Sequence, residues 1–168
     1  MRVLGVDPGL EATGYGVIER TDTGDVRLLE AGVIRTETRI PLAERLVTIS
    51  REIRQVIGDL RPAVLVLEEL YSAYKHPRTA ILMGHARGVI CLAAAEAGLP
   101  VVGYAPARIK QAVVGTGRAS KEQIGRMVTL KLALTQVPQP DDVTDALAVA
   151  LTHSQMSRGL ASAKVGEP

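Results

Sequence analysis

The sequence predicts an α/β protein with a five-stranded mixed sheet, in which an antiparallel meander is extended by parallel strands and flanked by helices. Short apolar runs bounded by turn residues alternate with longer stretches of helical periodicity. The first three strand-like runs are separated only by turns, which is typical of antiparallel pairing. The length of 168 residues is that of one domain with one core.

The N-terminal part of the chain predicts three strands. Residues 2–6 form a nearly continuous apolar run that ends at an Asp-Pro-Gly sequence, as expected for a strand buried on both faces and followed by a turn. Residues 14–20 and 26–35 are rich in Val, Ile and Leu, and the residues between them are turn formers. We therefore expect an antiparallel meander.

A helix and a fourth strand follow. Apolar residues recur every three or four positions over residues 42–60, between two prolines, which indicates an amphipathic helix. Residues 63–67 are fully apolar and predict a second buried strand. Strand, helix and strand in this order suggest a parallel crossover.

The C-terminal part predicts one more strand among helices. Ser120 and Gln123 resemble a capping box at a helix start, and Pro140 is placed to begin the last helix. Residues 158–168 are expected to form a disordered tail, which leaves 1–157 as a single domain. The expected elements are helices at 77–98, 106–114, 120–134 and 140–157 and a strand at 101–104.

Composition excludes several classes of protein. The single cysteine excludes an internal disulfide framework, and the hydrophobic content of 46% excludes a disordered chain. The longest apolar run, residues 89–95, is far shorter than the roughly 18 residues that a membrane span needs. An aspartate at position 7 comes too early for a signal peptide. We expect a cytoplasmic protein that does not contact membranes.

Charge is unevenly distributed along the chain. The net charge is only +2, yet residues 71–131 carry +7 and the remainder carries −5. Such asymmetry suggests a polyanionic partner, although a solvated surface with chance clustering explains the charge equally well.

Two acidic residues end the strands that the sequence predicts to be most buried. Asp7 follows the first apolar strand, and Glu68 follows the strand at 63–67. If these strands are parallel neighbours, both carboxylates emerge at the same end of the sheet, where sites of α/β proteins gather. Adjacent strands lie about 4.8 Å apart, so the two side chains could share an ion.

A further acidic group stands at the start of the last helix. Asp142 and Asp145 are three residues apart and share a helix face, which continues through the apolar Val149. Favourable interaction with the helix dipole is the alternative explanation, and it is the better one for Asp141.

Taken together, the four carboxylates predict a metal site. Each pair at about 4 Å would repel by roughly 4 kcal/mol at an effective dielectric constant of 20, and divalent cations remove that repulsion. All-oxygen sites suit Mg²⁺ or Mn²⁺, and two such ions can activate water against a phosphodiester. His76, His85 and His153 lie on separate segments, so no zinc cluster is expected.

Several ordered motifs resemble the RuvC family of bacterial Holliday-junction resolvases. The resemblance extends from residue 2 to about residue 153. The motifs are VDPGL at 6–10, TGYG at 13–16, LEELY at 67–71, GHARG at 84–88, IKQAVVG at 109–115 and DVTDALA at 142–148.

The resemblance implies an RNase H-like fold and a homodimeric, metal-dependent endodeoxyribonuclease acting in recombination and repair. Such an enzyme nicks two strands of like polarity across a four-way junction and leaves 5′-phosphate ends. It also implies a RuvA–RuvB branch-migration complex as partner. The implied catalytic and metal-binding carboxylates are Asp7, Glu68, Asp142 and Asp145, held with two Mg²⁺ or Mn²⁺ ions.

The resemblance also implies residues that contact DNA. Tyr71 occupies the position of an aromatic side chain that stacks on a base near the crossover, and Lys110 and Lys121 match functional lysines of the family. Arg87 is open to two interpretations, a phosphate contact or a structural partner. The expected DNA-binding residues are Tyr71, Tyr74, Lys75, Arg78, Arg87, Lys110, Arg118 and Lys121.

Three questions stay open at this point. A nucleotide-binding enzyme of the actin and sugar-kinase type shares the sheet topology but needs a second, duplicated domain. A second alternative is a non-catalytic junction-binding protein, which would be expected to have lost the four carboxylates, or a related single-strand nuclease. The small residues of the helix at 77–98 suit packing against a twin helix or against the sheet equally well.

Overall fold

A computed structural model describes residues 1–69 and 77–163, and of residues 158–163 it describes the backbone only. It contains a five-stranded sheet in the order β3-β2-β1-β4-β5. The first three strands pair antiparallel, and β4 pairs parallel with both β1 and β5. This arrangement confirms the predicted mixed sheet. The strands are β1 (Arg2–Asp7), β2 (Ala12–Arg20), β3 (Val26–Arg35), β4 (Val64–Glu68) and β5 (Val101–Tyr104).

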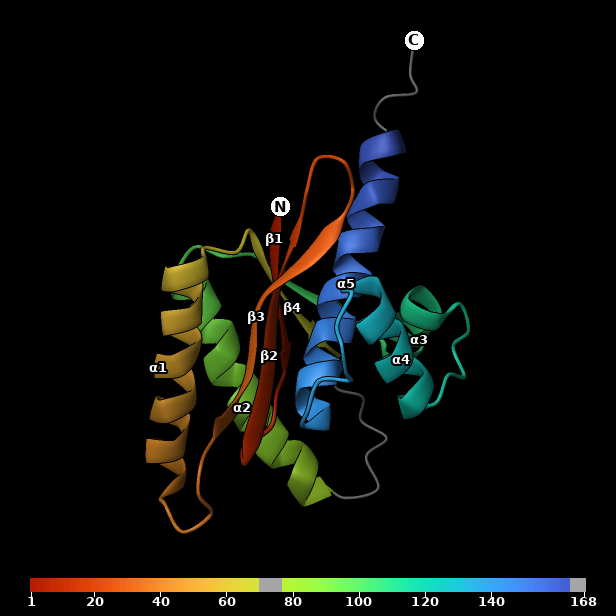
Figure 1. The fold of residues 1–168 in the computed structure, drawn as a ribbon. Helices are drawn as coiled ribbons and strands as arrows, with labels where there is room; N and C mark the ends of the chain where they lie inside the picture. Colours follow the sequence, from red (N-terminus) through yellow and green to blue (C-terminus); the bar gives the residue numbers. More distant parts are fainter. Residues whose placement is uncertain (70–76, 164–168) are drawn as a thin grey trace.

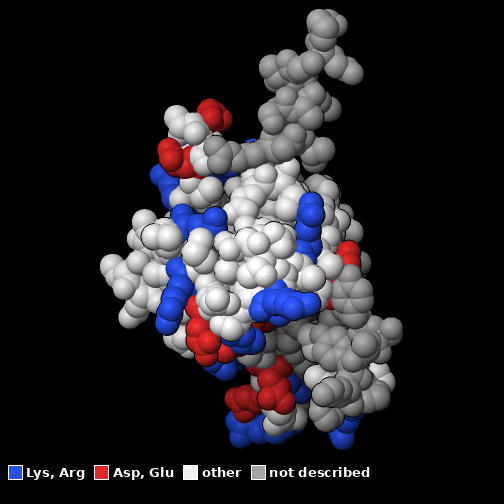
Figure 2. All heavy atoms as spheres, turned by 90° about the vertical axis from the view of Figure 1, so that its right-hand side faces the viewer, with Lys and Arg blue, Asp and Glu red and all other residues white. Residues whose placement is uncertain are grey.

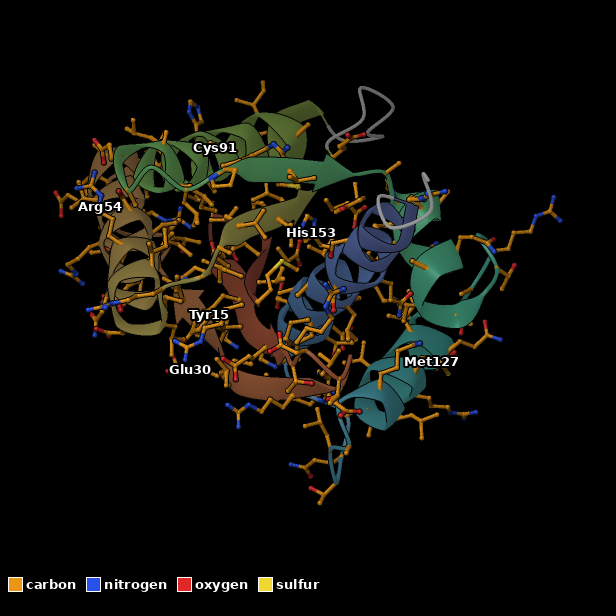
Figure 3. The ribbon with its side chains drawn as sticks, turned by 90° about the horizontal axis from the view of Figure 1, so that it is seen from above. Tyr15, Glu30, Arg54, Cys91, Met127 and His153 are labelled. Carbon is orange, nitrogen blue, oxygen red and sulfur yellow. The ribbon has the colours of Figure 1, made fainter. Side chains whose placement is uncertain are left out.

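Helices cover both faces of the sheet, as Figures 1 and 3 show. One face carries α1 (Leu42–Leu60) and α2 (Pro77–Glu96), and the other carries α5 (Asp141–Ala163). Beyond α5 lie α3 (Pro106–Val114) and α4 (Lys121–Lys131). The strands that the sequence predicts to be buried on both faces, β1 and β4, therefore lie between two helical layers.

Side chains of β4 alternate between two apolar cores. Val64 and Val66 pack with α3, α4 and α5, whereas Leu65 and Leu67 pack with α1 and α2. Because successive side chains of a strand point to opposite faces, a continuous apolar sequence is what a central strand of a three-layer protein requires.

The long helix α5 lies unusually close to the sheet. A Cβ atom on Gly5 of β1 would stand only 2.1 Å from the main-chain oxygen of Ala146 and 2.9 Å from the Cβ of Ala150. A side chain at Gly5 would therefore push α5 away from β1. This close approach sets the position of the helix that carries Asp142 and Asp145.

Helix ends differ from the sequence predictions at three places. The capping box of Ser120 and Gln123 is confirmed, but α4 ends at Lys131, because the chain turns at Ala133 with φ of 50°. The second helix ends at Glu96, two residues before the predicted Gly98. The last helix runs to Ala163, so residues 158–163 of the expected tail are helical. One glycine costs a helix only about 1 kcal/mol relative to alanine, so Gly159 does not end it.

No helix among the described residues is long and apolar enough to cross a membrane.

Candidate active site at the carboxyl ends of β1 and β4

The first two carboxylates stand at neighbouring strand ends. Parallel pairing sets Val6 of β1 opposite Leu67 of β4, so Asp7 and Glu68 follow at the same edge of the sheet. Both residues are partly buried. The expectation that these two acidic residues lie side by side is met by the register of the strands.

A glycine allows the start of α5 to reach this edge. Gly14 of β2 pairs with Asp7, and a Cβ on Gly14 would lie 2.0 Å from the main-chain oxygen of Asp142. Only a residue without a side chain permits this approach. The first turn of α5 is thereby held against the end of β1.

A pocket of about 330 Å³ opens between these elements. Pro8 and Met83 line one part of it, and Pro106, Ile109, Ile124 and Ala148 supply much of its apolar wall. The sequence did not assign these residues to the site, although Pro8, Ile109 and Ala148 stand within its motifs, because their pattern is that of ordinary turn and core positions. The charged residues that line the pocket are Asp7, Glu68, Lys110, Lys121 and Asp145.

Negative charge is crowded in this pocket. Burial is the largest cause that raises the pKa of Asp7 to about 7, and the nearby negative charges of Asp145, Asp142 and Glu68 also contribute to this rise. Burial also raises the pKa of Glu68 and the pKa of Asp145. The carboxylates of three distant chain segments thus interact electrostatically.

Two lysines partly offset this charge. The Nζ of Lys121 lies 3.3 Å from the Oδ2 of Asp145, and the negative charge of Asp145 raises the pKa of Lys121. Lys110 also lines the pocket, and its positive charge lowers the pKa of Glu68 against the larger effect of burial. Both lysines lie where they would face an anion bound in the pocket.

Two neighbouring acidic residues lie outside this group. The carboxylate of Asp141 is largely exposed and reaches Lys121 at 3.9 Å. The side chain of Glu69 lies over Gly103 of β5, on the other side of the strand from Glu68.

The pocket fits a hard divalent cation, because its acidic residues offer carboxylate oxygens as ligands. The nearby lysines do not balance the negative charge of these residues, since the pKa of Asp7 stays raised. Within residues 1–69 and 77–163, no three Asp, Glu, His or Cys side chains already form a group that could hold one ion. Binding would therefore require the carboxylate side chains to adjust.

Apart from Lys110 and Lys121, which line the pocket, the expected DNA-binding residues fall into three groups. Tyr71, Tyr74 and Lys75 lie outside the described residues. Arg78 and Arg118 are exposed. On the side of the molecule where α3 and α4 lie, Figure 2 shows a largely uncharged central area with basic side chains around it and acidic side chains below it. The side chain of Arg87 instead donates a hydrogen bond to the main-chain oxygen of Glu68, which favours the structural interpretation of this residue.

His153 lies away from the carboxylates. Its Nδ1 is 2.8 Å from the hydroxyl of Tyr104, between α5 and β5, and burial lowers its pKa (Figure 3). The sequence pattern of a lone helical histidine does not reveal this pairing.

The fold and the site together define an RNase H-like nuclease, with carboxylates at two strand ends and at the start of a helix. Residues 3–153 match the family model described as crossover junction endodeoxyribonuclease RuvC. The chain belongs to the RuvC family.

Individual relatives agree with this assignment. The protein is 50% identical to the crossover junction endodeoxyribonuclease RuvC of Rhodopirellula baltica, over 89% of this chain and 83% of the relative. It is 49% identical to that of Pelotomaculum thermopropionicum, over 92% and 93% of the two chains. Its fold is similar to Thermus thermophilus RuvC in complex with a Holliday junction substrate, with a TM-score of 0.89 and 38% identity over 95% of this chain and 96% of that one.

Proposed function

We propose that this protein is a metal-dependent endodeoxyribonuclease that resolves four-way (Holliday) DNA junctions by paired symmetric nicks. The observation that carries this proposal is the crowding of carboxylates from β1, β4 and α5 in one pocket, where Asp7 has a pKa of about 7. A buried cluster of this kind favours cation binding, since cations relieve the repulsion. Membership of the RuvC family supplies the substrate class.

The four carboxylates would hold the metal. Asp7 and Glu68 present oxygen donors from adjacent strand ends, and Asp142 and Asp145 present theirs from the N-terminal part of α5. Mg²⁺ or Mn²⁺, two ions to each site, suits these donors; when bound, such ions activate water and stabilise the leaving oxygen of a phosphodiester.

The lysines act on the DNA phosphate. Lys110 and Lys121 line the same pocket as the carboxylates and carry the positive charge that would attract the scissile phosphate. They would also stabilise the additional negative charge of the transition state. The resulting ends carry 5′-phosphates, as in the family that the chain resembles.

A homodimer would place two such pockets on one junction. The outer face of α2 suits a twin helix, because Ile81, Gly84, Gly88 and Leu92 recur at helical spacing and are all exposed. Nothing stands within 4 Å of a Cβ built on either glycine. Ala86, Ala93 and Ala94 are fully buried in the core instead, so the small residues of α2 are divided between two faces.

The DNA contacts and partners follow from the same proposal. Arg78 and Arg118 are exposed and would contact phosphates, as would Lys75, with Tyr71 and Tyr74 stacking on bases. We further propose that residues 1–157 form a single nuclease domain and that the protein is cytoplasmic. It would work with a RuvA–RuvB complex in recombination and repair.

A cleavage assay tests this function. A mobile four-way junction and a linear duplex of the same sequence are incubated with the protein, with Mg²⁺ or with EDTA. We expect paired nicks in the junction only, and only with Mg²⁺. Cleavage of both substrates alike, or binding of the junction without metal-dependent cleavage, would overturn the proposal.

A further inference from the structure

Arg87 joins the helix α2 to the end of strand β4. It is partly buried next to Ala86, which faces the core, and Ile90 on the same helix is fully buried as well. Its Nη1 donates a hydrogen bond of 2.6 Å to the main-chain oxygen of Glu68, the last residue of β4. The contact is with the backbone of the residue that presents a carboxylate to the pocket.

The direction of the peptide groups in β4 shows which neighbour the Glu68 carbonyl faces. The amides of Leu65 and Glu69 donate to Pro100 and Tyr104, on the β5 side, at 2.9 Å each. Peptide groups alternate in direction along a strand, so the N–H and C=O of Glu68 point the other way, toward β1.

The amide donor that β1 would offer to the Glu68 carbonyl is missing. Val6 is opposite Leu67, so one further step of the ladder sets Asp7 opposite Glu68 and the amide of residue 8 opposite the Glu68 carbonyl. Residue 8 is proline, which has no N–H. The paired register of the two strands accordingly ends at Val6 and Leu67.

We propose that Arg87 is a positioning residue: its guanidinium supplies the hydrogen bond that Pro8 cannot donate and holds the peptide that carries Glu68 in the orientation needed for metal binding. It acts through the backbone of Glu68 and not through a DNA phosphate. The inference rests on the proposed function only for the metal-binding role of Glu68. The hydrogen bond itself is tested separately.

The first test uses the metal-free protein without DNA. Arg87→Met removes the donor but keeps a side chain of similar length, and Arg54→Met on α1 removes an exposed arginine that pairs with Glu96 of α2. We expect hydrogen exchange at residues 64–69 to accelerate in R87M and to stay unchanged in R54M. Unchanged exchange in R87M would overturn the proposal whether or not the protein is a nuclease.

The second test measures Mn²⁺ affinity by titration calorimetry, again without DNA. Loss of a residue that orients a metal ligand typically weakens affinity by 10–100-fold, so we expect at least a tenfold loss in R87M and none in R54M. Arg87→Lys keeps one donor and should lie between wild type and R87M. Equal Mn²⁺ affinity in all four proteins would contradict the proposal.

The third test separates positioning from phosphate contact. In EDTA, we expect R87M to bind a four-way junction with the affinity and salt dependence of wild type, while its single-turnover cleavage rate at saturating junction with Mg²⁺ falls by 10–100-fold. Weaker binding with a salt slope reduced by about one would identify a phosphate contact and overturn the proposal.

A double substitution tests the missing hydrogen bond directly. Pro8→Ala restores an amide at the next step of the ladder, so the variant P8A/R87M should recover Mn²⁺ affinity relative to R87M. A further loss of affinity that adds to the effect of R87M would count against the argument. If wild type itself neither binds Mn²⁺ nor cleaves junctions, the proposed function fails, and the exchange experiment still decides the role of Arg87.

Discussion

Replacement of Asp7 by asparagine should stabilise the metal-free protein while it abolishes activity. In the folded protein, burial and three neighbouring carboxylates raise the pKa of Asp7 from 3.8 to about 7. The difference between these two pKa values corresponds to roughly 4 kcal/mol of unfavourable free energy when the carboxylate is ionised. Asparagine has nearly the same shape but carries no charge, so it removes this cost.

The pH dependence follows from the protons that each state binds. Between pH 3.8 and about 7, the folded protein retains a proton on Asp7 that the unfolded chain has released. The contribution of Asp7 to stability therefore falls as pH rises through this window. We expect D7N to exceed wild type by about 2–4 kcal/mol at pH 8 in EDTA, and the two proteins to be equally stable below pH 3.8.

Urea denaturation at several pH values in EDTA measures this difference. Asp22→Asn, in the exposed turn between β2 and β3, is the matched control and should have little effect. Saturating Mg²⁺ should abolish or reverse the advantage of D7N, because the ion stabilises only the wild-type site. A D7N protein that is no more stable than wild type at pH 8 would refute the idea of crowded carboxylates. Unchanged junction cleavage by D7N would remove Asp7 from the mechanism.

Three further substitutions test other parts of the site, and a fourth, at Gly58, is a control. Lys110→Ala should lower the single-turnover cleavage rate by about 10²-fold and lower the free energy of unfolding by no more than about 1 kcal/mol, because Lys110 offsets the charge of Glu68; a normal rate would contradict its role. Gly14→Ala forces a Cβ against the backbone of Asp142 and should cost about 3 kcal/mol in urea denaturation, whereas Gly58→Ala, on an open part of α1, should stabilise by up to about 1 kcal/mol. Arg118→Ala should reduce the salt slope of junction binding by about one, measured by fluorescence anisotropy, and leave Mn²⁺ affinity unchanged.

Hydrophobic periodicity was sufficient to predict the order and type of the elements. Side chains of β1 and β4 are buried on both faces of the sheet, so these strands require continuous apolar runs. Helix α1 buries only one face, so its apolar residues recur every three or four positions. Helix ends were less predictable. The end of α4 depends on a left-handed residue at Ala133, and no glycine or proline there signals it.

The position of Asp7 and Glu68 at one edge of the sheet could be predicted, because each residue ends a continuous apolar strand and parallel neighbouring strands end at the same edge. The position of α5 could not. It depends on Gly5 and Gly14. A glycine such as Gly14 indicates that some backbone passes close by, but the partners of these two glycines, Ala146 and Asp142, are defined only after the helix has packed across the sheet.

The sequence by itself determined the chemistry of this protein: the kinds of side chain available, their order along the chain and the strand ends that bear acidic residues. Tertiary structure decided which groups meet. The contact of Arg87 with the Glu68 carbonyl needs the register of β1 against β4, a proline at the position of the next donor and a helix that returns to the same edge. Such contacts join residues far apart in the chain, and local propensity carries no information about them because they form only when the layers pack.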